Sequence, residues 1–213
     1  MTGTMTEKPA PVMGTGRLEA FSDGVIAIII TVMVLELKMP EGTNISALLP
    51  VLPPLMSYAL SFIYVGIYWN NHHHMLRAAS HVNGGILWAN LYLLFWLSLV
   101  PFTTDWMGQN HFAAVPSALY GVVLLMAGIA YLLLQRAILA ADGPDSLLAK
   151  AVGRDLKGKI SAVIYAASIP VALFVSPMLT QAMFVLVALM WLVPDTRIEK
   201  VLAETESEKW SSP

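Results

Sequence analysis

The sequence predicts an all-α membrane protein with six transmembrane helices and both termini in the cytoplasm, and three observations support that prediction. Apolar residues make up 57% of the 213 residues and charged residues 12%, with a mean hydropathy of +0.67. Soluble domains average about 45–50% apolar and about 25% charged residues. The apolar residues fall in blocks long enough to cross a bilayer, and the basic residues lie almost all on one side of them. Because the chain has no cysteine, disulfide and thiolate chemistry are excluded.

The six spans can be placed in order along the chain. The first ends before Pro40, and the second carries prolines in its opening turns, where a missing backbone N–H is tolerated. The last apolar stretch would be about 51 Å long as one helix, against a hydrocarbon core of about 30 Å. We therefore expect Ser176 and Pro177 to form a tight turn between two short spans. The spans are predicted at about residues 18–37, 47–69, 86–102, 112–135 and the two halves of 160–193.

The basic residues orient this arrangement. Eleven of the twelve Lys and Arg residues lie on one side of the six spans and only Lys38 lies on the other, so the positive-inside rule makes the first side cytoplasmic. Residues 1–16, in which no cleavable signal peptide is apparent, are predicted to be a flexible cytoplasmic tail. Residues 17–194 then form the six-helix transmembrane domain, and residues 195–213 form a polar cytoplasmic tail.

Arg17, Ser22 and Asp23 place charge and hydrogen-bonding groups in the first turns of the first span. A carboxylate inside a membrane helix costs about 2.5–3.5 kcal/mol on insertion scales, so Asp23 should face a partner, a cavity or a pore. One interpretation is local: Arg17 extends to the interface, Ser22 bonds to the backbone and Asp23 favours the helix dipole. The other is a buried polar network that holds this helix against its neighbours.

A second polar cluster ends the second span, on the same predicted side of the membrane. It contains Trp69 and three consecutive histidines, His72, His73 and His74, which are within reach of the charges on the first span. Adjacent histidines suggest a metal site. Consecutive helical positions point about 100° apart, however, so the three histidines cannot converge on one ion. We therefore expect no metal and no cofactor.

One stripe of the first span is apolar apart from a hydroxyl. Gly24, Ile28, Thr31 and Leu35 recur at i, i+4, i+7 and i+11, with Val32 alongside, so they share one face of the helix. Such a stripe is compatible with ordinary helix packing and with the wall of a pore. The Thr31 hydroxyl fits either interpretation, because it can bond to a backbone carbonyl of the preceding turn.

Other features narrow the possible functions. Glu36 and Asp105, predicted near the outer face, are either solvated surface charges or groups that attract cations. The absence of a Thr-Val-Gly-Tyr-Gly filter excludes a potassium channel with a cage of backbone carbonyls. The sequence also contains no Walker A loop, no Gly-x-Ser-x-Gly and no His-Glu-x-x-His motif.

The segment Arg17-x-x-x-Phe21-Ser22-Asp23, followed by an apolar helix, resembles the signature of the transmembrane protein 175 family of potassium channels. The resemblance covers the whole six-span unit. It implies a prokaryotic member in the plasma membrane, with one six-span unit per subunit and a pore formed by oligomerisation as a homotetramer. Further matches end the second and third spans: Tyr68-Trp69-x-x-His72-His73 and Pro101-Phe102-Thr103.

The resemblance also implies where ions pass. In this family the first span of four subunits lines the pore, which bulky aliphatic side chains narrow without a carbonyl filter. Carried onto this sequence, the constriction falls on Ile28, a threonine layer on Thr31 and a further narrowing on Leu35, with Val32 beside them. The polar network that positions the pore helix would comprise Arg17, Ser22, Asp23, Trp69, His72 and His73.

We therefore predict a passive potassium channel rather than an enzyme, with K⁺ as the permeant ion, lipid around it and no nucleic-acid partner. The alternative is a small secondary or proton-coupled transporter that uses Asp23 and His72 or His73 as a relay. Saturable, counter-ion-dependent flux would favour that alternative. An intramembrane enzyme with Asp23 and His73 as acid and base is the weakest reading, because no nucleophile accompanies them.

Overall fold

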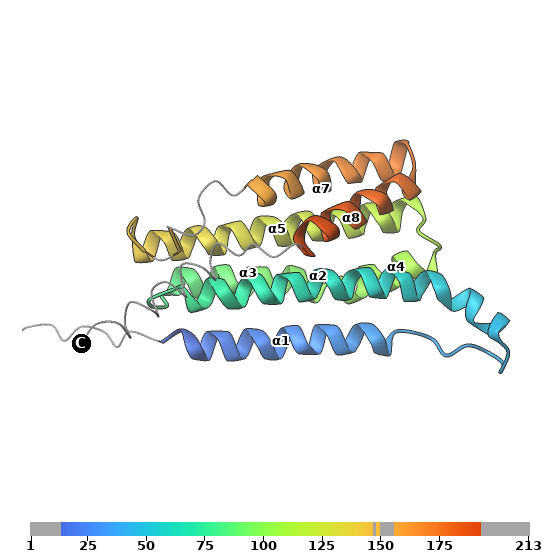
Figure 1. Ribbon diagram of the computed structural model, residues 1–213, viewed down its shortest axis with the longest axis horizontal. Coiled ribbons are helices and arrows are strands. Elements are labelled where there is room, and N and C mark those ends of the chain that lie inside the picture. The colour runs from blue at the N-terminus through green and yellow to red at the C-terminus, as the bar shows by residue number, and fades with distance from the viewer. Residues whose placement is uncertain (1–13, 147, 150–155, 193–213) are drawn as a thin grey trace, which may run out of the picture.

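The computed structural model describes residues 14–146, 148–149 and 156–192, and every regular element in those residues is a helix. Five helices or consecutive helix pairs are long and apolar enough to cross a membrane. The sixth predicted span is the apolar helix α8, which has 16 residues and is therefore about 24 Å long. Figure 1 shows the elements in chain order: α1 (Thr15–Leu35), η1 (Ile45–Val51), α2 (Leu52–Arg77), α3 (Gly84–Ser98), α4 (Val100–Gln109), α5 (Ala114–Asp142), α7 (Leu156–Phe174) and α8 (Pro177–Leu192). The predicted all-α membrane fold is confirmed.

The ends of the first two spans differ from the prediction. Helix α1 begins at Thr15, so the last two residues of the predicted N-terminal tail are helical. Helix α2 runs past Trp69 to Arg77, because no proline or glycine interrupts residues 67–77. The histidine cluster therefore lies within a regular helix. Residues 1–13 and 193–213, which hold the rest of the predicted tails, lie outside the described residues.

The third span is two helices in succession. Helix α3 ends and α4 begins around Leu99, two residues before Pro101. Proline has no N–H and its ring crowds the preceding turn, so it interrupts the helical ladder at this point. The span nevertheless continues to Gln109, beyond its predicted end at Phe102. The predicted turn is also present, with Val175 and Ser176 between α7 and α8.

Helix α5 lies at the centre of the bundle and separates two groups of buried side chains. One group fills the space between α1, α2, α3 and α5, and the other joins α2, α4, α5, α7 and α8. Helix α5 packs mainly against α3 and α7, and Figure 1 shows α1 at one edge of the bundle and α7 at the opposite edge. The first helix therefore has one side that packs on the bundle and one side that faces outward.

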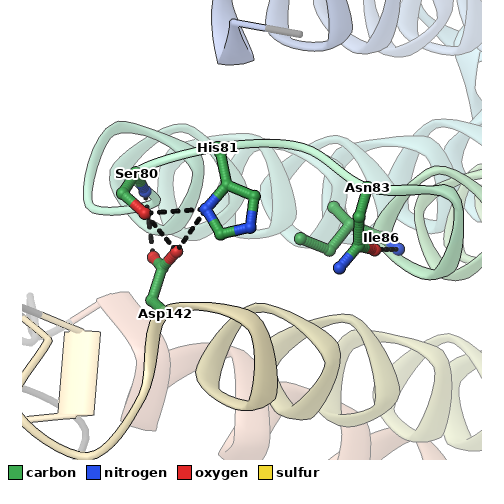
Figure 2. Close-up of polar contacts among 5 residues, drawn as sticks. All are labelled: Ser80, His81, Asn83, Ile86 and Asp142. Atoms are coloured by element: carbon green, nitrogen blue, oxygen red, sulfur yellow. Dashed lines mark hydrogen bonds and ion pairs between the residues drawn. The ribbon is translucent and has the colours of Figure 1, made fainter. Parts of the chain in front are cut away.

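The loops gather at two ends of the bundle. Figure 1 shows the α1–α2, α4–α5 and α7–α8 connections at one end, and the start of α1, the α2–α3 loop and the end of α5 at the other. At this second end Ser80 donates its backbone N–H (2.9 Å) and its hydroxyl to the Asp142 carboxylate. His81 Nδ1 lies 3.2 Å from the same carboxylate. Figure 2 shows this contact, which fastens the α2–α3 loop to the end of α5.

Candidate functional site

Helix α1 has two chemically different sides. The side that packs on the bundle carries five buried residues: Leu18, Ser22, Ile26, Ile29 and Met33. On the outward side, the side chains of Ile28 and Leu35 are 62% and 79% exposed in the protomer. Gly24 and Thr31 are exposed on the same side. We call residues 24, 28, 31 and 35 the outer stripe of α1, and it coincides with the stripe predicted from the sequence.

The outer stripe carries one hydroxyl group, on Thr31. Thr31 Oγ1 donates to the backbone oxygen of Ile28 at 2.9 Å, so its proton is used within the helix. Val32, beside the stripe, is half-buried. It lines a hollow of about 530 Å³ between α1 and the α3–α4 span, which Glu36 and Asp105 also line. Both predicted outer acidic residues thus lie along one groove, which Ile28 of the outer stripe also lines.

A polar network ties the packed side of α1 to α2 and α3. Asn90 of α3 is at its centre: its Nδ2 donates to Ser22 Oγ of α1 at 2.9 Å, and its Oδ1 accepts from His72 Nε2 of α2 at 2.7 Å. All three residues are fully buried. Ser22 Oγ in turn donates to the backbone oxygen of Leu18 at 2.8 Å. Buried polar groups of this kind require partners, because an unsatisfied group in an apolar environment is costly.

A second set of polar contacts joins α1 to α2 closer to the surface. Trp69 Nε1 donates to Asp23 Oδ1 at 2.9 Å, and His73 Nδ1 lies 2.7 Å from Glu19 Oε1. The indole of Trp69 and the imidazole of His73 stack with their centroids 6.0 Å apart. His72 and His73 therefore serve different helices, since His72 bonds to Asn90 of α3 while His73 contacts Glu19 of α1.

The structure brings together most, but not all, of the residues predicted for the positioning network. Ser22, Asp23, Trp69, His72 and His73 all make contacts between helices. Arg17 is exposed, and it forms no hydrogen bond or ion pair with another described residue. Its membership of the network therefore stays a prediction.

Sequence reasoning missed two members of the network. Asn90 stands in the middle of a span of apolar and aromatic residues, and a polar residue at that depth signals an interhelical partner. Glu19 precedes Asp23 by four residues, so both carboxylates lie on the same side of α1. Neither signal names the partner, because that depends on how α2 and α3 pack against α1.

The fold and the network define a multi-pass membrane protein whose first helix is held on one side and open on the other. A sequence model of the family described as "Endosomal/lysosomal potassium channel TMEM175" matches residues 17–101, the part of the chain that contains the outer stripe and the network. A protein named a potassium channel in Chryseobacterium sp. (strain P1-3) is 54% identical over 192 residues, which cover 90% of this chain and all of that protein. The chain belongs to the TMEM175 family, a family of channels rather than enzymes, as the resemblance predicted.

Less similar proteins are also described as potassium channels. A protein named a potassium channel in Streptomyces collinus is 32% identical over 125 residues, covering 55% of this chain and 61% of that protein. A crystal structure described as a lysosomal potassium-selective channel TMEM175 homolog from Chamaesiphon minutus superimposes with a TM-score of 0.75 and 26% identity. It covers 85% of this chain and 97% of the other. The relatives' names favour a channel over the transporter alternative.

Proposed function

We propose that this protein conducts potassium ions passively through a pore lined by α1 of four identical subunits. The named relatives support potassium as the ion, and the 54% identity to one of them extends over that protein's whole length. The observation that carries the proposal is the outer stripe, whose four residues recur along one face of α1 and are all exposed in the protomer. No cofactor is required, because the ion passes through and is not transformed.

The stripe sets the chemistry of the pore. One helix cannot enclose a path, so each subunit must supply one wall, and four copies of Ile28 would meet on the axis. Aliphatic side chains offer no ligand to replace the water around a cation, so such a ring dewets and acts as a gate. Thr31, one turn further on, adds a hydroxyl oxygen that can accept a hydrogen bond, because its proton is donated to the Ile28 carbonyl. Leu35 would form a second aliphatic narrowing.

The polar network would hold α1 in position without touching the ion. Ser22 and Ile28 are six residues apart, which places them about 120° apart around the helix. Ser22 is buried against Asn90 while Ile28 is exposed, so the bonds that hold α1 lie on its packed side. Asp23 also points to α2 rather than along the stripe, since it accepts from Trp69.

The charges give this channel an orientation. Arg17, Arg77 and Lys157 lie at the start of α1, the end of α2 and the start of α7, which all belong to one end of the bundle, and Lys38 lies beyond the other end of α1. By the positive-inside rule the first end is cytoplasmic. The groove that contains Glu36 and Asp105 would then be at the outer face, where its carboxylates favour cations over anions.

The test compares asparagine at two equally exposed positions. Ile28→Asn places a polar side chain on the outer stripe, and Val163→Asn places one on α7, where the side chain is 68% exposed against 62% for Ile28. A decrease of about 1.4 kcal/mol in the barrier raises a rate tenfold, so wetting the ring should raise single-channel conductance several-fold and lower the K⁺/Na⁺ permeability ratio. Purified protein in planar bilayers with K⁺ and Na⁺ gradients gives both quantities.

Val163→Asn should leave conductance and reversal potential unchanged, because α7 lies at the opposite edge of the bundle from α1. The proposal fails if Ile28→Asn behaves like Val163→Asn in assembled, conducting protein. It also fails if currents saturate with substrate and depend on a counter-ion, which is the behaviour of a carrier.

A further inference from the structure

The polar contacts between α1 and α2, which the proposed function uses only to hold α1 in place, also bring together three side chains that can bind a metal. Glu19 and Asp23 on α1 and His73 on α2 each offer one ligand atom, and these atoms all lie within 4.8 Å of one another. His73 Nδ1 and Glu19 Oε1 are 2.7 Å apart. The cluster is half-buried and lies near the start of α1, about 100° or more around the helix from the outer stripe.

The donor set has the chemistry of a transition-metal site. One imidazole nitrogen and two carboxylates are ligands that Zn²⁺ accepts, and three protein ligands leave one position of the tetrahedron for water. Ca²⁺ and Mg²⁺ prefer oxygen ligands alone, so the histidine selects against them. The histidine and the carboxylates come from two different helices, so an ion there would link α1 to α2.

The spacing is close to what an ion needs. Ligands about 2.1 Å from Zn²⁺ in a tetrahedron lie about 3.4 Å from each other. The Glu19–His73 pair is already closer than that, and the other separations, all within 4.8 Å, close with small rotations of the carboxylates. Two carboxylates and a neutral imidazole carry a charge of −2, which a divalent cation cancels.

Trp69 holds two of the three ligands in orientation. Its indole N–H donates to Asp23 Oδ1 at 2.9 Å, which leaves the other carboxylate oxygen for the ion. Its ring stacks on His73 with an interplanar angle of 26°, which fixes the direction of the imidazole. Outer groups that orient ligands in this way are typical of metal sites and raise their affinity.

We propose that Glu19, Asp23 and His73 bind one divalent transition-metal ion, with Zn²⁺ as the best fit, and that the ion fastens α1 to α2 at the end of the bundle where α1 begins. The site lies off the outer stripe and does not depend on whether α1 lines a pore. Bound Zn²⁺ stabilises the fold by linking two helices, because a ligand that binds only the folded state raises its stability.

The test uses the full-length protein purified in detergent and freed of metal with a chelator. Zn²⁺ titration by calorimetry should give one equivalent per chain, and Co²⁺ should give the visible absorption of a four-coordinate ion. Glu19→Gln and His73→Gln should each weaken Zn²⁺ binding at least tenfold. His81→Gln is the matched control, since His81 also lies beside a carboxylate at the same end of the bundle, and it should keep the wild-type affinity.

Thermal unfolding with and without Zn²⁺ provides a second readout. Zn²⁺ should raise the midpoint of the wild type and of His81→Gln, and at the same Zn²⁺ concentration should raise the midpoints of the two ligand variants less. Equal binding by wild type and His73→Gln would overturn the proposal, as would wild-type protein that binds no Zn²⁺ at micromolar concentration. If a variant does not fold, the Co²⁺ spectrum of the wild type decides, because six-coordinate Co²⁺ or no spectrum also refutes the site. Potassium currents of metal-free protein test the channel separately.

Discussion

Asn90→Ala should destabilise the protein more than any other single change of one polar side chain in the network. Asn90 of α3 bonds to both α1 and α2, through Ser22 and His72. Alanine removes both bonds and leaves His72 Nε2 buried without its acceptor. Ser22 loses a donor but keeps its own bond to the Leu18 carbonyl, so the larger penalty falls on the histidine.

The expected cost can be worked from these contacts. Interhelical hydrogen bonds in membrane proteins contribute about 0.6 kcal/mol on average and about 1.7 kcal/mol at most, so two of them give about 1–3 kcal/mol. The volume lost at a fully buried site adds about 1 kcal/mol. We therefore expect Asn90→Ala to lower the free energy of unfolding by about 2–4 kcal/mol.

Reversible unfolding in mixed detergent micelles measures this change. Ser98→Ala is the control on the same helix, because Ser98 is exposed and its hydroxyl donates only to the Phe95 carbonyl one turn away; its cost should stay below about 0.5 kcal/mol. A double-mutant cycle of Asn90→Ala with Ser22→Ala should show coupling. If Asn90→Ala and Ser98→Ala lower the free energy of unfolding equally, and Asn90 shows no coupling to Ser22, the hydrogen bonds of Asn90 do not stabilise the fold as proposed.

Two further outcomes follow from the packing and the charges. Gly108→Ala should lower the free energy of unfolding by about 1–3 kcal/mol, since a Cβ there would lie 2.7 Å from Pro54 Cα. Gly66→Ala is the control, because a Cβ at Gly66 meets open space. Identical melting temperatures for the two variants would contradict the close approach of α4 to α2. Single cysteines at Thr43 and Asn110 should react with an impermeant thiol reagent from outside the cell, and a cysteine at Asp145 should react only after permeabilisation. The chain has no native cysteine, and labelling at Asp145 in intact cells would reverse the proposed orientation.

Much of the fold follows from the sequence because the bilayer limits what a backbone can do. An apolar block of membrane length must form a helix, since its N–H and C=O groups find no water. That argument places α1, α2 and α5, and the length of the final apolar stretch predicts the turn at Ser176. The outer stripe is also visible in the sequence, because exposure and helical periodicity follow the same 3.6-residue repeat.

The sequence does not show which helices pack against one another. Helix α2 continues to Arg77 because its polar end packs on α1 and α3, and a pattern of apolar residues ends at Trp69, where that polar end begins. Asn90 is one amide in an apolar span, and only the packing of α1 and α2 beside α3 shows that its partners are Ser22 and His72. The third span is also predicted to end at about Phe102, next to Pro101, yet it continues as α4 to Gln109.

The two sides of α1 also explain why a membrane channel would keep polar groups that cost energy to insert. Apolar contacts between helices are not directional, so a helix held only by Ile26, Ile29 and Met33 can rotate about its axis with little penalty. The Ser22–Asn90 bond is directional and fixes that rotation. A turn of about 100° would replace Ile28 by Ile29 on the outward side and would move the outer stripe to the flank of the helix. The network near the start of α1 thus favours one rotation of the helix, and a variant that breaks it should change which residues face outward as well as the stability.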